Sequence, residues 1–113
     1  MQEKVAEINL ERNMPTAEAA LNSLKNYMLT YRAQGYKALV LIHGYGSTGV
    51  GGSIKAAVTK ALTQGQLQNM VRLMAGGEQW HYRKRELLAF CKQLELYERH
   101  IANNQGVTVV ILK

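Results

Sequence analysis

The sequence predicts one α/β domain over residues 1–113, built as a sandwich of two or three layers, of which we adopt the two-layer form. Apolar runs of strand length alternate with segments whose apolar residues recur at helical spacing, and glycines separate these segments. With 113 residues, 47% of them hydrophobic, the chain can bury a core without metals or disulfides. The predicted order is βαβαβαβ, a βαβα core followed by a third strand, a C-terminal helix and a final strand.

The first strand and helix are predicted from alternation and from capping residues. Residues 5–10 alternate apolar and polar side chains loosely, which favours a strand. Asn13 or Thr16 can cap a helix that has Pro15 in its first turn and ends at Gly35. The apolar stripe of this helix consists of Ala17, Leu21, Leu24, Met28 and Tyr31.

The remaining elements follow from apolar runs and glycine breaks. Residues 38–42 are continuously apolar, which is typical of a strand buried on both faces, and the βαβ connection predicts pairing parallel to the first strand. Helices are expected over 53–64 and 86–101, and strands over 70–75 and 107–112. The helix at 86–101 also carries apolar residues outside its main stripe, which form either a partner surface or a second packing layer. They are Leu88, Phe90, Leu96 and Tyr97.

The segment between the second strand and the second helix is rich in glycine and predicts an anion site. The strand ends at His43, and a helix is expected to begin near Ser53. Glycine lets main-chain N–H groups approach a ligand closely, and a helix N-terminus adds a partial positive charge. Open α/β sheets bind ligands at the carboxyl ends of their strands, so a phosphate is the expected ligand here. The candidate binding residues are His43, Gly44, Tyr45, Gly46, Ser47, Gly51, Gly52 and Lys55.

The charge distribution favours a nucleic acid as the partner. The net charge is +6, and no acidic residue lies between Glu18 and Glu78, an interval that contains the glycine segment and several basic residues. The run at 83–85 is Arg-Lys-Arg and follows the aromatic trio at 80–82, a mixture that pairs with phosphates and stacks on bases. The same run is equally typical of a solvated surface.

Other classes of function fit the residues less well. Aspartate is absent and the three histidines are far apart, so no metal site and no cofactor are expected. The glycines match a dinucleotide fingerprint, but the acidic residue that should follow about twenty positions later is missing. No Gly-Lys-Ser/Thr follows the segment, which excludes a Walker A loop, and Tyr45 occupies the position where a serine hydrolase needs glycine.

Cysteine usage and hydropathy predict a cytoplasmic protein without a membrane partner. The single cysteine, Cys91, cannot form an intramolecular disulfide, and we expect it to fill the core. No apolar run resembles an export signal or is long enough to span a membrane. The oligomeric state stays open.

The glycine segment and its surroundings resemble the Smr (small MutS-related) domain family. The family hallmark is a strand ending in His-Gly-x-Gly, then a further glycine and a Leu/Ile-Arg/Lys pair that opens a helix. Here it reads His43-Gly44-Tyr45-Gly46 and Gly52-Ser53-Ile54-Lys55. Further matches lie at 8–10, 14–16, 77–78 and 104–110, so the resemblance covers nearly the whole chain and points to stand-alone bacterial members.

This resemblance implies a fold like the C-terminal domain of a bacterial translation initiation factor, together with DNA or RNA binding. Several Smr domains also nick DNA or cleave RNA, which makes His43 a candidate catalytic residue. The chain departs from many catalytic members on the first strand, where Asn9 replaces an aspartate and Glu11 replaces a histidine or arginine. Tyr45 stands where many members have Lys or Arg. A non-catalytic adaptor for nucleic acid or the ribosome is therefore the alternative to an endonuclease.

His43 itself has two interpretations. As a functional group it pairs with phosphate when protonated, or acts as a general acid or base near its ordinary pKa of about 6.5. As a structural group at the end of a buried strand, its ring hydrogen-bonds a nearby carbonyl. The resemblance favours the functional interpretation.

Overall fold

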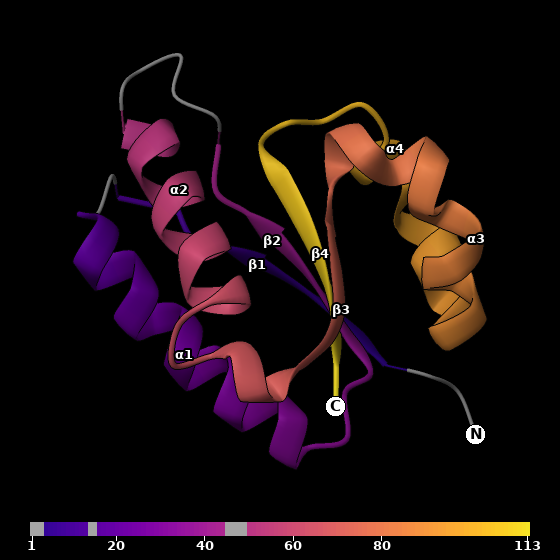
Figure 1. Ribbon diagram of the computed structural model, residues 1–113, viewed down its shortest axis with the longest axis horizontal. Helices are drawn as coiled ribbons and strands as arrows, with labels where there is room; N and C mark the ends of the chain where they lie inside the picture. Colours follow the sequence, from indigo (N-terminus) through magenta and orange to yellow (C-terminus); the bar gives the residue numbers. More distant parts are fainter. Residues whose placement is uncertain (1–3, 14–15, 45–49) are drawn as a thin grey trace.

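Strands and helices alternate along the chain as predicted (Figure 1). The computed structural model describes residues 4–13, 16–44 and 50–113. The elements are β1 (Val5–Asn9), α1 (Ala17–Ala33), β2 (Ala38–Ile42), α2 (Val50–Thr63), η1 (Gln68–Met70), β3 (Val71–Gly76), η2 (Gly77–Gln79), α3 (Trp80–Phe90), η3 (Lys92–Tyr97), α4 (Glu98–Ile101) and β4 (Val107–Leu112), where η marks a 3-10 helix. Among these described residues, no helix is long and apolar enough to cross a membrane.

The connection from β1 to β2 forms where local capping predicts it. Of the two candidate caps, Thr16 caps α1, because its hydroxyl oxygen accepts a hydrogen bond from the Ala19 N–H at 3.1 Å. Gly35 follows the helix with φ +83°, a conformation that glycine adopts without strain, and it turns the chain back toward β2. The predicted parallel pairing of β1 and β2 is confirmed.

The described strands form a mixed sheet in the order β1-β2-β4-β3. β4 runs antiparallel to β2 and to β3, so β1, β2 and β3 all end at one edge of the sheet, where β4 begins. His43 follows β2 directly and therefore lies at this edge. The sheet topology places the predicted site where ligands gather in open α/β sheets.

Helical segments cover both faces of this sheet (Figure 1). α1 and α2 pack on one face through residues such as Leu24 and Ile54, and α3, η3 and α4 pack on the other through residues such as Trp80 and Leu94. The α/β class is confirmed, but the sandwich has three layers rather than the expected two. The reason is that the central strands β2 and β4 are apolar on both faces, and each face needs a helical cover.

The single helix predicted over 86–101 is wrong in its bounds. α3 begins at Trp80 and ends at Phe90, Cys91 has extended backbone angles, and η3 and α4 follow. The break keeps Leu87, Cys91 and Leu94 fully buried in one core while the chain changes from α to 3-10 geometry. Most of the apolar residues outside the stripe pack partly against this core, as the second-packing-layer interpretation expects, whereas Leu96 is exposed. The packed residues are Leu88, Phe90 and Tyr97.

Candidate functional site

The candidate site lies at the sheet edge where β2 ends and α2 begins (Figure 1). α2 begins at Val50 rather than near Ser53, so Gly51 and Gly52 belong to the first turn of the helix. The first N–H groups of an α-helix have no partner within the helix, and the helix dipole adds a partial positive charge there. The predicted residues Tyr45, Gly46 and Ser47 lie outside the described part of the chain.

His43 is fully buried, and both of its ring nitrogens are hydrogen-bonded. Nδ1 lies 2.6 Å from the carbonyl oxygen of Gly44, and Nε2 lies 2.8 Å from the hydroxyl oxygen of Thr108. A carbonyl oxygen can only accept, so we assign the ring proton to Nδ1. In the neutral ring, Nε2 then accepts a hydrogen bond from the Thr108 hydroxyl.

The surroundings of His43 keep the ring neutral at neutral pH. Burial lowers its pKa from the ordinary value of 6.5; the bond to the Gly44 carbonyl raises the pKa, and the charge of Lys55 lowers it. Smaller contributions from Glu78 and Glu11 raise the pKa without reversing the direction. A protonated ring, the form that would pair with phosphate, is therefore disfavoured in this position.

The backbone at the end of β2 is also committed to internal bonds. The N–H groups of His43 and Gly44 both donate to the Gly106 carbonyl oxygen, at 2.8 Å and 3.1 Å. Together with the bond to Thr108, these contacts join the end of β2 to the start of β4. The geometry thus favours the structural interpretation of His43, and the Gly44 amide already has a partner of its own.

Lys55 is the predicted site residue that carries a charge, and Glu78 of η2 holds it. The Lys55 Nζ lies 2.9 Å from Glu78 Oε2, with side chains 28% and 38% exposed. Burial raises the pKa of Glu78, but the hydrogen bond from Lys55 and the nearby positive charge outweigh this effect and lower it. An ammonium group has three N–H donors, so Lys55 can contact a phosphate while it keeps Glu78.

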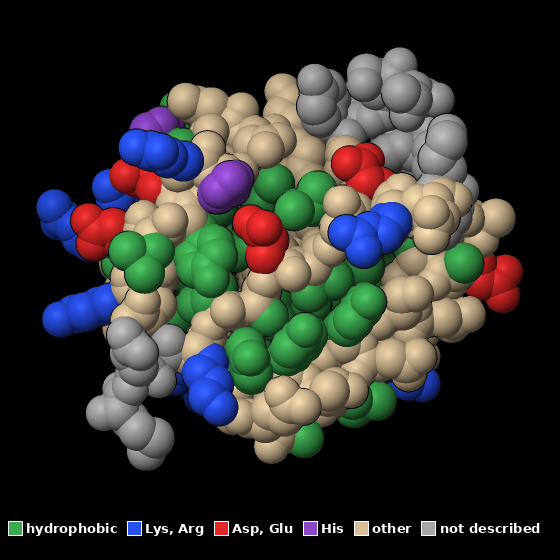
Figure 2. Space-filling model, turned by 180° about the vertical axis from the view of Figure 1, so that it is seen from behind, with side chains coloured by type: hydrophobic (Ala, Val, Ile, Leu, Met, Phe, Trp, Pro, Cys, Tyr) green, Lys and Arg blue, Asp and Glu red, His purple; other side chains and the backbone are tan. Residues whose placement is uncertain are grey.

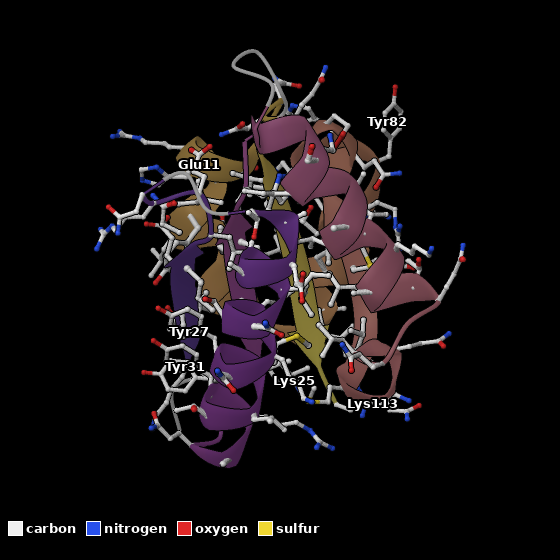
Figure 3. The ribbon with its side chains drawn as sticks, turned by 90° about the vertical axis from the view of Figure 1, so that its left-hand side faces the viewer. Glu11, Lys25, Tyr27, Tyr31, Tyr82 and Lys113 are labelled. Atoms are coloured by element: carbon white, nitrogen blue, oxygen red, sulfur yellow. The ribbon has the colours of Figure 1, made fainter. Side chains whose placement is uncertain are left out.

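The aromatic trio separates into core and surface. Trp80 is fully buried, and its indole N–H donates to Glu98 Oε2 at 2.5 Å. Tyr82 is 89% exposed and lies at the same end of the molecule as the start of α2 (Figure 3). Tyr82, and not Trp80, is therefore placed to stack on a ligand.

The basic run at 83–85 is partly neutralised. Arg83 pairs with Glu86 at 2.6 Å, and Lys84 pairs with Glu98 at 2.7 Å. Exposed pairs of this kind contribute little to stability, but each reduces the positive potential that a phosphate would meet. The solvated-surface interpretation therefore describes much of this run.

Two residues at the site were missed by reasoning from sequence. Thr108 stands 65 positions from His43, and only the antiparallel register of β2 with β4, which pairs Leu41 with Thr108, brings it to the ring. Glu78 carried one signal, the match of the Gly-Glu pair at 77–78 to the family pattern. Nothing in that match indicated its bond to Lys55.

The substituted motif of the first strand forms a local turn. The Asn9 side-chain oxygen accepts a hydrogen bond from the Glu11 N–H at 2.9 Å, just after β1 ends. Among the described residues, no three or more His, Cys, Asp or Glu side chains are grouped so that they could hold a metal ion.

Comparison with known proteins agrees with the resemblance. The Smr domain model matches residues 12–113. The chain is also similar to the crystal structure of the Smr domain of Thermus thermophilus MutS2, with a TM-score of 0.57 and 22% sequence identity over 97% of this chain and 98% of that one. This likeness shows a shared fold. No curated protein matches the chain. Because the family model spans nearly all of the sequence, the chain belongs to the Smr domain family, which is known for binding and nicking nucleic acids.

Proposed function

We propose that this protein binds DNA or RNA at the sheet edge around the start of α2, and that it acts as a non-catalytic adaptor. The observation that carries this proposal is the environment of His43, which is buried, neutral and bonded at both ring nitrogens. A general acid or base must reach the reacting atoms and change its protonation state, and this ring is placed for neither. His43 is instead a positioning residue that holds the point where the glycine segment leaves β2.

The binding residues in this proposal are the N–H groups of Gly51 and Gly52 and the ammonium group of Lys55. α2 contains no acidic residue, and Gly52, Lys55 and Lys60 help to line a shallow hollow on its exposed side. Phosphates bound there would meet the helix N-terminus first and then two lysines along the helix. Tyr82 lies at the same end and offers its ring to a base (Figure 3). Tyr45, Gly46 and Ser47 stay candidates on the sequence alone.

We also propose that the protein is cytoplasmic. The buried thiol of Cys91 fits a reducing cytoplasm, where nucleic acids are accessible to a small domain. The family pattern favours a bacterial source.

The Lys55–Glu78 pair gives a test with two opposite outcomes. Lys55→Gln should weaken binding and reduce the slope of log K against log salt by about one, because one phosphate contact is lost. Glu78→Gln should strengthen binding several-fold, because it removes a negative charge that repels a phosphate bound at Lys55. The measurement is fluorescence anisotropy of a labelled oligonucleotide at several salt concentrations.

The matched control is Lys25→Gln on α1, which changes the net charge by the same amount far from the start of α2 (Figure 3). It should weaken binding less than Lys55→Gln does. Equal effects of the two lysine variants, or weaker binding by Glu78→Gln, would show that binding does not occur at this edge.

A cleavage assay distinguishes the adaptor hypothesis from the endonuclease hypothesis. Supercoiled plasmid and structured RNA are incubated with the wild type and with His43→Gln, and the same samples are run as gel shifts. We expect both substrates to be retained and neither to be cut. Cleavage by the wild type that disappears in a folded His43→Gln variant would contradict the adaptor proposal.

A further inference from the structure

We propose that a groove between α1 and β1 binds single-stranded nucleic acid, with bases stacked on Tyr27 and Tyr31. This inference rests on the proposed function and adds to it the strandedness of the ligand and a second contact surface.

The groove follows β1, which is an edge strand of the sheet among the described residues. One hollow of about 490 Å³ is lined by the end of β1, by Asn13 and by the tyrosines of α1. A second hollow of about 640 Å³ continues along α1 to Tyr36. Both hollows include Ser23, Tyr27 and Tyr31 in their walls, so they lie next to each other along α1, and we call the two together the groove. Seen from behind, a band of hydrophobic side chains crosses this face of the molecule (Figure 2).

Three tyrosine rings form a row along the groove. The ring centroids of Tyr27 and Tyr31 are 6.2 Å apart with planes 17° from parallel, and those of Tyr31 and Tyr36 are 4.6 Å apart in an edge contact. Tyr27 is 42% exposed, and both Tyr27 and Tyr31 point to the β1 side of α1 (Figure 3). Partly exposed aromatic rings in a row are the platform on which proteins stack the bases of single strands.

The polar side chains of the groove favour bases within it and phosphates at its two ends. Amide side chains, including Asn9, Asn26 and Gln34, line it and can donate to and accept from base edges. Glu7 also lines the groove and would repel a phosphate placed between the tyrosines. Arg12 lies in the wall at one end of the groove. At the other end the Lys4 Nζ lies 5.5 Å from the centroid of the Tyr36 ring. Positive charges therefore lie at both ends, where the sugar-phosphate backbone of a bound strand would enter and leave.

One end of the groove and the proposed phosphate site both lie at the end of the sheet where β1 and β2 finish. Ile42 lines the groove and directly precedes His43, and the Leu10 N–H donates to the Ile42 carbonyl oxygen at 2.7 Å. A single strand that contacts both surfaces would run across this end of the sheet. A duplex hides its base faces in its own stack, so only an unpaired strand can use the tyrosine row.

A peptide strand added to β1 fits this edge less well. The Lys4 carbonyl oxygen accepts a hydrogen bond from the start of β2, and the Leu10 N–H donates one to the end of β2. The backbone groups of β1 that point away from β2, where a peptide strand would pair, therefore belong to every second residue from Val5 onward. The Tyr97 hydroxyl donates to the Val5 carbonyl oxygen at 3.4 Å and covers part of this edge. The tyrosine row favours bases as the occupant.

The test compares the affinities of a short labelled single-stranded DNA, an RNA of the same sequence and the corresponding duplex. Tyr27→Leu removes the ring and keeps apolar bulk, Tyr27→Phe keeps the ring, and Leu29→Ala is the control on the same helix, at a residue 48% exposed and outside the groove walls. Tyr27→Leu should weaken binding of both single strands about tenfold, in the range found for loss of one base stack. Its effect on the duplex should be small, and Tyr27→Phe and Leu29→Ala should bind as the wild type does. Thermal melting checks that each variant is folded.

The outcomes separate the two proposals. If the wild type binds no nucleic acid, both fail. If the wild type binds and Lys55→Gln weakens binding, but Tyr27→Leu equals Leu29→Ala, only the groove proposal fails. A wild-type dimer in light scattering that Tyr27→Leu converts to a monomer would also overturn it, because a second copy would then occupy the groove.

Discussion

Replacing His43 by alanine should destabilise the fold by about 3 kcal/mol, because the ring is the hydrogen-bond partner of the Thr108 hydroxyl and of the Gly44 carbonyl. Thr108 is 2% exposed, so water cannot replace the His43 ring as the hydrogen-bond partner of its hydroxyl. Leaving this buried hydroxyl without a partner costs about 2 kcal/mol. The Gly44 carbonyl belongs to a partly exposed residue and can regain water, so its share is about 1 kcal/mol.

Two further variants divide this loss between the two bonds. His43→Gln places an amide oxygen near the position of Nε2, keeps the Thr108 bond and should cost about 1 kcal/mol. Thr108→Val removes the hydroxyl at nearly constant volume, and its effect should be non-additive with His43→Ala by about 1 to 2 kcal/mol.

Urea unfolding followed by fluorescence of the single, buried Trp80 measures these differences. With a slope of about 2 kcal/mol per molar urea, the midpoint of His43→Ala should shift by about 1.5 M. A loss of unfolding free energy below about 1 kcal/mol for His43→Ala at unchanged slope would refute the assignment of both ring bonds. Equal losses for the Ala and Gln variants would refute the bond between Nε2 and Thr108.

The lowered pKa of His43 predicts that stability falls as the pH drops through 6.5, because the unfolded chain then takes up a proton that the folded ring resists. The fall should level off below the folded pKa and be absent in His43→Gln, and a flat urea-unfolding profile between about pH 7 and 5 would contradict it. Gly77→Ala should lower the melting temperature strongly, because the added Cβ would overlap the carbonyl oxygens of Ile101 and Asn104; an unchanged melting temperature would count against this packing.

The central strands were predictable because their residues are almost all apolar. The run at 38–42 is continuously apolar and the run at 107–112 is apolar apart from Thr108, a pattern typical of strands covered on both faces, and both strands are central in the sheet. The same pattern required helical cover on two sides, so the apolar strands already argued for three layers. The helix break at Cys91 carried no glycine or proline signal, because it arises from packing against the sheet.

The position of the site was predictable from the sequence, but the hydrogen-bond partners of its side chains were not. The glycine segment placed His43 and Lys55 at the carboxyl ends of the strands, since both the motif and the topology are local. The partners of these side chains, Thr108 and Glu78, come from distant segments that only the tertiary fold brings near. Burial of His43 also depends on those segments, so its protonation state could not be read from the motif.

Where a nucleic acid contacts this chain can be measured directly by titrating an oligonucleotide into labelled protein and following each amide in two-dimensional NMR spectra. The account predicts that the largest shift changes fall on Gly51, Gly52, Lys55 and Tyr82, with those of Tyr27 and Tyr31 added for single strands only. Changes confined to the opposite end of the molecule, near Lys113 (Figure 3), with the start of α2 unaffected, would contradict it.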